Sequence, residues 1–176
     1  MIPETSIKTY SGKWFDFLNP DPRSIVIEDI AHALSMICRF TGQSSVFYSV
    51  SQHSVLVSRL VPKGFEICGL LHDASEAYMG DLVKPLKGII PRYREIEEVV
   101  MRAVAKSFGL DYPFPPEVKK ADILALAMEG KRFMHGREDE FGELPEGAEP
   151  LRESSWSPVE AGIMFLRRYR ELEPRK

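Results

Sequence analysis

The chain has 176 residues, a formal net charge of −3, 44% hydrophobic residues and 28% charged residues. This composition is that of an ordinary globular domain and excludes an intrinsically disordered chain. No apolar run approaches the roughly 20 residues that cross a bilayer, so we expect no membrane segment. The acidic balance argues against binding of long nucleic acid, which needs a basic face, but local Lys and Arg clusters can still hold one phosphate group.

The first residues, Met1 to Thr5, lack the basic start and the apolar block of a secretion signal, so we expect a cytoplasmic protein. Cys38 and Cys68 lie in apolar surroundings and have no CxxC spacing. This pattern predicts two free, buried thiols and neither a disulfide nor a zinc site.

The N-terminal part of the sequence predicts a small hairpin followed by helices. Residues 8–18 hold two aromatic-rich runs around a Ser-Gly turn, which is typical of a hairpin. Apolar residues at helical spacing predict a helix over 27–39. Ser49 followed three residues later by Gln52 predicts a capping box that starts the next helix, closed at 62–64.

The rest of the sequence continues the helical pattern. It predicts helices at 65–79, 92–108, 115–133 and 158–172, an interrupted segment at 85–91 and a long polar loop at 135–158. We therefore expect an all-α domain of about five to seven helices. The single domain spans 1–176, with the hairpin and turn in 1–26, a helical core in 27–134, and the loop and C-terminal helix in 135–176.

The stretch 69–81, Gly-Leu-Leu-His-Asp-Ala-Ser-Glu-Ala-Tyr-Met-Gly-Asp, places four ionisable side chains in an otherwise apolar helix. His72 and Asp73 are neighbours, and Glu76 follows four and three residues later, so the three can share one rim. Carboxylates beside a buried face cost several kcal/mol unless they are paired or bound to a cation. The stretch therefore indicates a cation site, with a solvated helix edge as the alternative.

Similar groups fall on two other predicted helices. His53 lies in the first turn after the Ser49 cap, and Asp122 interrupts the apolar face of the 115–133 helix. Together with His72 and Asp73 they offer two imidazoles and two carboxylates, which suit Mn, Fe, Co or Zn and leave positions for water or substrate. Open positions indicate a catalytic site.

The ordered set of His53, His72-Asp73 and Asp122 resembles the signature of the HD-domain metal-dependent phosphohydrolases. The surrounding sequences resemble the 5'-deoxynucleotidase branch and phage HD proteins that include dATP triphosphohydrolases. These sequences are Ser51-Gln52-His53-Ser54, Leu70 to Glu76, Gly80-Asp81-Leu82 and Val118 to Asp122. The resemblance covers about residues 28–134.

The resemblance implies an HD-domain helical bundle in which His53, His72, Asp73 and Asp122 hold a divalent metal ion, with Co, Mn, Zn or Fe expected and Mg as a further alternative. The carboxylate of Glu76 would orient or deprotonate a water molecule. Asp81 would assist by hydrogen bonding or by protonating the leaving 5'-oxygen.

The resemblance also implies substrate-binding residues. Arg39 matches an arginine that reaches phosphate, and Lys87 and Lys119 would do likewise or would be solvated surface charges. Phe40 stands where 5'-deoxynucleotidases carry a Trp that crowds the sugar. Sugar selectivity is therefore open, because an apolar wall rejects an added hydroxyl only weakly.

The activity that the resemblance implies is cleavage of a (deoxy)nucleotide between the 5'-oxygen and the α-phosphorus. A monophosphate would release phosphate, and a triphosphate such as dATP would release triphosphate. A nucleotide-binding regulatory module with vestigial activity and an HD nuclease are the alternatives. The expected partner is a small nucleotide, and a homo-oligomer, dimer or higher, is expected from the family.

Two further histidines and a charged stretch of the 115–133 helix lie outside this set of site residues. His32, in a helix with apolar neighbours, is expected to be a hydrogen-bonded core residue and not a ligand. His135, in a polar loop, is expected to be exposed. Glu129 and Lys131-Arg132 follow Asp122 on the same helix and could face the pocket mouth, but the sequence assigns them no role.

Overall fold

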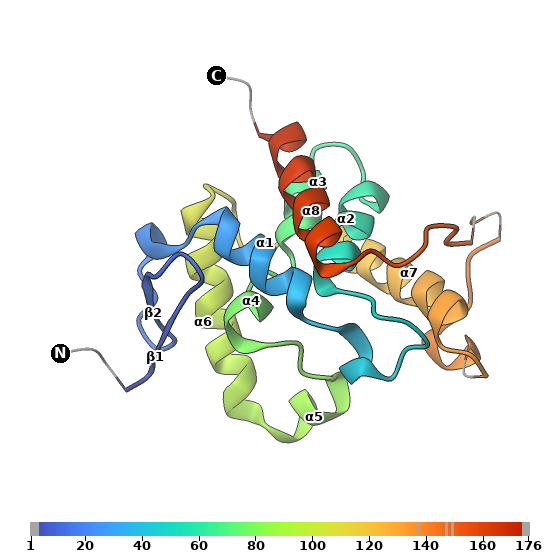
Figure 1. The fold of residues 1–176 in the computed structure, drawn as a ribbon, viewed down its shortest axis with the longest axis horizontal. Coiled ribbons are helices and arrows are strands. Elements are labelled where there is room, and N and C mark those ends of the chain that lie inside the picture. The colour runs from blue at the N-terminus through green and yellow to red at the C-terminus, as the bar shows by residue number, and fades with distance from the viewer. Residues whose placement is uncertain (1–3, 137, 147, 149, 174–176) are drawn as a thin grey trace.

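The computed structural model describes residues 4–136, 138–146, 148 and 150–173. A two-stranded hairpin of β1 (Ser6–Lys8) and β2 (Trp14–Asp16) precedes a helical body (Figure 1). The helices are α1 (Ile27–Met36), α2 (Val50–Leu60), α3 (Glu66–Leu71), α4 (Glu76–Met79), α5 (Lys84–Ile89), α6 (Pro91–Ser107), α7 (Pro116–Phe133) and α8 (Pro158–Leu172), with 3-10 turns η1 (Pro22–Ser24), η2 (Arg39–Gly42) and η3 (Glu138–Phe141). The all-α prediction with a small hairpin is confirmed.

The hairpin is anchored to the helices by one aromatic and one polar contact. Its strands pair antiparallel with Ile7 opposite Phe15, and the buried Phe15 ring stacks on Tyr78 at 3.9 Å between centroids. The backbone N–H and the hydroxyl of Ser11 both donate to the carboxylate of Asp29, at 2.6 and 2.8 Å. The hairpin loop therefore sits on the first turn of α1.

Helix α2 lies at the centre of the molecule. All nine residues from Val50 to Ser58 are buried. Val55 belongs to a core cluster shared with α1, α6 and α8, whereas Val57 belongs to a second cluster shared with α7. Figure 1 shows α1 and α8 side by side in front of α2. A side chain on α2 is thus surrounded by protein, which is unusual for polar residues unless they are paired.

The prediction of one continuous helix over 65–79 is wrong. The helix is interrupted between α3 and α4, where the backbone N–H groups of Ala74 and Glu76 bond three residues back, to Leu71 and Asp73, at 3.0 Å. In a regular α-helix the carbonyl of Gly69 accepts from the N–H four residues on. Here this carbonyl lies 2.9 Å from Nδ1 of His72. The imidazole thus competes for a backbone acceptor, and the chain tightens at the His-Asp pair.

The capping box predicted at α2 is half right. The Ser49 hydroxyl accepts from the N–H of Gln52 at 3.1 Å, as an N-cap should. The Gln52 side chain does not complete the box, because it is buried against the segment that precedes α8. Its amide donates to the carbonyl of Ser154 and accepts from the N–H of Trp156, both at 2.9 Å. Gln52 therefore docks this segment onto α2.

Three smaller predictions have clear outcomes. His32 is exposed and stacks on Tyr10 at 3.8 Å, so its prediction as a core residue is wrong: its position on α1 faces the hairpin loop and not the core. His135 is exposed, as predicted. In the described part of the chain Cys38 and Cys68 are free thiols, Cys68 buried and Cys38 half-buried.

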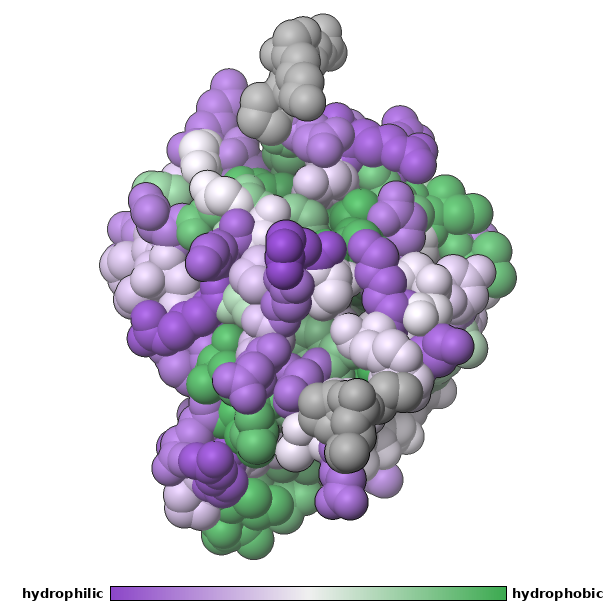
Figure 2. Space-filling model, turned by 90° about the vertical axis from the view of Figure 1, so that its left-hand side faces the viewer, coloured by the Kyte–Doolittle hydropathy of each residue, from purple (hydrophilic) through white to green (hydrophobic). Residues whose placement is uncertain are grey.

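Much of the molecular face that carries the hairpin is polar, and hydrophobic residues gather at its lower end and at its upper right edge (Figure 2). None of the helices over the described residues combines the length and hydropathy needed to cross a membrane.

The structure does not describe residues 1–3 of the predicted N-terminal segment, residues 137, 147 and 149 of the predicted 135–158 loop, or residues 174–176 of the predicted domain.

Replacement of Gln52 tests its docking role. Gln52→Ala removes the partners of two backbone groups and should lower the free energy of unfolding by about 1–3 kcal/mol, because buried polar groups would lose their hydrogen bonds. Gln43→Ala, at an exposed position, should change it by less than about 0.5 kcal/mol. Urea unfolding followed by circular dichroism measures both, and equal effects would contradict the docking role.

Candidate metal centre

Three segments far apart in sequence bring two imidazoles and a carboxylate together. Nε2 of His53, from α2, lies 3.2 Å from Nε2 of His72, in the turn after α3, and 3.3 Å from Oδ1 of Asp122, on α7. The donor atoms of these three residues all lie within 4.8 Å of one another. The group could therefore hold a metal ion.

Asp73 directs its carboxylate to the same place. Its Oδ2 lies 3.1 Å from Nε2 of His72 and 3.5 Å from Nε2 of His53. The interruption between α3 and α4 thus lets two consecutive residues face one point. All four predicted ligands are brought together.

The surroundings of the imidazoles fit metal binding. Nδ1 of His53 lies 2.6 Å from Oε1 of Glu129, and Nδ1 of His72 lies 2.9 Å from the carbonyl of Gly69. Both acceptors favour a proton on Nδ1, which leaves each Nε2 lone pair for a cation. Metal-binding histidines in proteins are held in this way by a carboxylate or a carbonyl.

The electrostatics of the group also call for a positive charge. Burial opposes protonation of His72, but the carboxylates of Asp73 and Asp122 outweigh it and raise its pKa to about 10. Burial likewise opposes ionisation of Asp122, yet hydrogen bonds to His53 and His72 hold its pKa well below the usual range. The negative potential of the carboxylates can be compensated by protons or by a metal cation.

Glu129 is the residue of the centre to which the sequence assigned no role. It is fully buried, and its two oxygens contact His53 and Arg39, the latter at 3.0 Å from Nη2. Burial would raise its pKa, but the charges of Arg39 and His53 hold the pKa below its ordinary value. One signal was available: Glu129 follows Asp122 by seven residues, which is two turns, and thus shares its helix face.

Arg39 lies at the centre as predicted, but most of its guanidinium faces protein. The side chain is buried; besides the contact with Glu129, its Nη1 is 3.8 Å from Oδ2 of Asp73. Phe40 packs beside it, 5.2 Å from the guanidinium carbon to the ring centroid. Phe40 and Thr41 both have left-handed backbones, with φ of 57° and 55°, which is strained for such residues. These two strained residues directly follow Arg39, the candidate for phosphate binding.

The two predicted catalytic carboxyls lie near the metal-binding group. Glu76 is buried; its Oε1 is 3.4 Å from Nζ of Lys87, and its Oε2 has no hydrogen-bond partner among the described residues. Burial, followed by the charges of Asp73 and Asp81, raises the pKa of Glu76 well above its ordinary value. Burial also raises the pKa of Asp81, against the opposing charge of Arg39. Both carboxyls are therefore protonated more easily than an ordinary carboxyl group.

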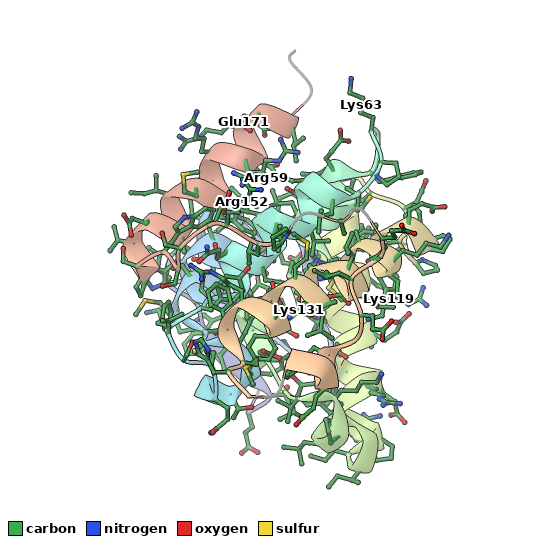
Figure 3. The ribbon with its side chains drawn as sticks, turned by 90° about the vertical axis from the view of Figure 1, so that its right-hand side faces the viewer. Arg59, Lys63, Lys119, Lys131, Arg152 and Glu171 are labelled. Atoms are coloured by element: carbon green, nitrogen blue, oxygen red, sulfur yellow. The ribbon has the colours of Figure 1, made fainter. Side chains whose placement is uncertain are left out.

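A cavity of about 460 Å³ adjoins the metal-binding group. His72, Asp73 and Asp122 form part of its wall, and the predicted substrate residues Lys87 and Lys119 line it as well. Nζ of Lys119 bonds Oδ2 of Asp122 at 2.7 Å, and Figure 3 shows Lys119 toward the outer edge of α7. This volume is within the range of small-molecule sites.

Other residues of the cavity wall were not predicted as site residues. Arg94, on α6, and Tyr112 and Phe114, in the connector before α7, also line the cavity. The sequence showed the connector only as a stiff, proline-rich segment and showed residues 92–98 as a charged helix face. Nothing in their spacing indicated that they line one cavity beside the metal-binding group.

No family model matches this sequence. It is 42% identical over 171 residues to "Uncharacterized protein YfdR" of Escherichia coli (strain K12), covering 94% of each chain. The chain belongs to the YfdR family. It is also 38% identical over 137 residues to "Uncharacterized protein RCAP_rcc00048" of Rhodobacter capsulatus, covering 70% of each chain. These relatives place the chain in a family and name no activity for it.

Metal binding is tested directly by removal of one imidazole. His53→Ala should lose bound metal after the protein is loaded with Mn, Co or Zn and desalted, because His53 contributes a buried nitrogen donor at the centre of the group. His32→Ala, which removes an exposed imidazole, should keep the wild-type content. Elemental analysis by mass spectrometry gives the metal content per chain. Unchanged metal in His53→Ala would rule out the centre.

Glu129→Gln tests the residue that the sequence left unassigned. The substitution keeps the shape but removes the charge that holds His53 and Arg39, and should weaken metal binding by about 10- to 100-fold. Glu95→Gln, at an exposed position of α6, is the matched control and should bind metal as the wild type does. Competition with a metal-sensitive dye measures both affinities. A wild-type affinity in Glu129→Gln would assign Glu129 to folding alone.

Proposed function

We propose that this YfdR-family protein is a metal-dependent phosphohydrolase of the HD type that cleaves a nucleotide between its 5'-oxygen and its α-phosphorus. The observation that carries the proposal is the group of His53, His72, Asp73 and Asp122, three of which (His72, Asp73 and Asp122) form part of the wall of a cavity that cationic side chains also line. A metal site that borders a cavity of ligand size is the arrangement expected of a catalytic centre.

The donor set favours a transition metal. Two imidazoles and two carboxylates suit Mn, Fe, Co or Zn, whereas Mg prefers a shell of oxygen ligands. When bound, such a cation supplies Lewis acidity to a phosphoryl oxygen and makes water a better nucleophile near neutral pH. The remaining roles fall to side chains of this chain.

Glu76 is the proposed proton acceptor for the attacking water. Its buried Oε2 lacks a partner in the described residues, and its raised pKa brings it closer to that of an efficient base at neutral pH. Lys87 fixes the other oxygen at 3.4 Å. Asp81, whose pKa is also raised, is the proposed donor of a proton or a hydrogen bond to the leaving 5'-oxygen.

The phosphate is proposed to lie between the metal-binding group and the cations around it. Arg39 is held by Glu129 and faces Asp73, so its guanidinium is fixed in advance of binding. Its buried Nε has no hydrogen-bond partner among the described residues and is an unused donor of the planar fork. Phe40, against Arg39, is the proposed wall beside the sugar.

The activity is tested by a product analysis. Metal-loaded protein is incubated with a panel of nucleoside and deoxynucleoside mono- and triphosphates, and the products are separated by ion chromatography. Release of nucleoside with phosphate or with triphosphate supports the proposal. No turnover of any nucleotide contradicts it; tight nucleotide binding without cleavage would then favour a regulatory module, and digestion of single-stranded DNA would favour a nuclease.

Glu76→Gln separates catalysis from metal binding. The variant should keep its metal and lose about 10²- to 10⁴-fold in kcat, since an amide cannot accept the proton from water. Glu171→Gln, on α8 and away from Lys119 in Figure 3, should retain wild-type rates. Metal content and initial rates are measured on the same preparations. Loss of metal in Glu76→Gln would contradict the assigned role.

A further inference from the structure

We propose that Arg94 binds phosphoryl groups beyond the one at the metal-binding group, so that the substrates are nucleoside polyphosphates. This inference rests on the proposed function and narrows its substrate class. Its basis is the set of charged side chains around the cavity. Among the cations in this set, Arg94 is the one that forms no ion pair with a residue that the structure describes.

The cavity is large enough to extend a ligand away from the metal-binding group. It is lined by α5, α6, the connector before α7 and the first turns of α7, and its volume is about 460 Å³. Asp73 and Asp122 form part of the wall, and Arg94 forms another part. A chain of phosphoryl groups that starts at the metal-binding group can therefore continue within one cavity.

The two acidic residues of α6 in this cavity already have partners. Oε1 of Glu97 lies 2.6 Å from Nζ of Lys87. Glu98 accepts from Arg102 at 2.6 Å and from the Tyr112 hydroxyl at 2.8 Å, with one oxygen for each. The carboxylates that could repel an anion are thus compensated by protein groups.

Arg94 has no such partner among the residues that the structure describes. Glu97 and Glu98 lie three and four residues after it on α6, which are the positions where a helical arginine finds a carboxylate. In the structure these two glutamates pair instead with Lys87 and with Arg102. Lys87 is paired with Glu97 and Glu76, and Lys119 with Asp122. Among the cations that line the cavity, Arg94 alone forms no ion pair with any residue that the structure describes.

The exposed arginines on the helices differ in this respect, because Arg132 and Arg170 likewise form no ion pair with a residue that the structure describes, whereas three others are paired. Arg92, Arg102 and Arg167 each pair with a glutamate three or four residues away on the same helix. An exposed arginine that lacks such a pair and lines a ligand-sized cavity has its full fork of donors open. This fork fits phosphate oxygens, often in a bidentate manner.

The cationic side chains around the cavity favour a substrate with more than one phosphoryl group. At the metal-binding group, the metal ion and Arg39 would be enough to balance the charge of a single phosphate. Each further phosphoryl group adds negative charge that needs a positive partner. Arg94 supplies one. Lys119 supplies a second, because a metal ion that shares the Asp122 carboxylate would weaken the Lys119–Asp122 pair.

The test uses inorganic phosphates as probes, so that it does not depend on turnover. Mn-loaded wild type, Arg94→Ala and Arg92→Ala are titrated with tripolyphosphate and with orthophosphate by calorimetry. We expect Arg94→Ala to reduce the preference for tripolyphosphate over orthophosphate by about tenfold, the effect of one charged hydrogen bond. Arg92→Ala removes the same charge from the same helix outside the cavity and should keep the wild-type preference.

Two outcomes would overturn the inference. One is an unchanged preference in Arg94→Ala; the other is an equal loss in Arg92→Ala, which would assign the effect to net charge. Arg94→Lys should recover part of the preference, since it restores the charge but not the fork.

Failure of the inference is distinguishable from failure of the proposed function. If the wild type hydrolyses dAMP but neither hydrolyses dATP nor prefers tripolyphosphate, the inference is wrong and the proposed function stands. If tripolyphosphate binds through Arg94 while no nucleotide is hydrolysed, the binding inference stands and the proposed hydrolysis is wrong.

Discussion

The structure depends on one buried contact, in which the carboxylate of Glu129 lies between the imidazole of His53 and the guanidinium of Arg39. Its distances of 2.6 and 3.0 Å join α7 to α2 and to η2. Burying the carboxylate of Glu129 without these partners would lower the stability of the fold by several kcal/mol. Burying the guanidinium of Arg39 without Glu129 would carry a similar penalty. The three groups therefore hold one another in place. The same contact orients the candidate metal-binding nitrogen of His53 on one side and, in the proposed enzyme, the guanidinium of Arg39 toward a phosphate on the other.

This contact also explains why the site lies inside the fold. Helix α2 is buried from Val50 to Ser58, so His53 is surrounded by packed side chains and cannot turn to solvent. The break after α3 then supplies His72 and Asp73 from one tight turn, and α7 supplies Asp122 two turns before Glu129. Rigid elements thus fix the donors, whereas the cavity wall comes from the shorter α5 and from the connector at 112–116. In the proposed enzyme the reaction centre is therefore rigid, and substrate selection falls to the more exposed segments.

Most helices could be predicted because apolar spacing is a local property. The expected helices at 92–108 and 158–172 match α6 and α8 to within one residue at each end, and the hairpin is displaced by two. Where prediction failed, a side chain had a partner elsewhere. Gln52 left its capping box for the backbone of Ser154 and Trp156, and His72 took the carbonyl that would have continued its helix. Neither partner can be identified from spacing alone, because both depend on how the chain folds back.

The sequence by itself determined the all-helical class and the four candidate ligands. Helical periodicity depends only on residues close together in the chain, and the ability of His and Asp to bind a cation is a property of each side chain. Only the tertiary structure decided what surrounds those ligands. Glu129 contacts partners 76 and 90 residues away, and its role depends on that meeting. Arg94 became available because Lys87, Arg102 and Tyr112 occupy the carboxylates beside it. Such pairings arise from competition among charges brought together by packing, which the order of residues does not show.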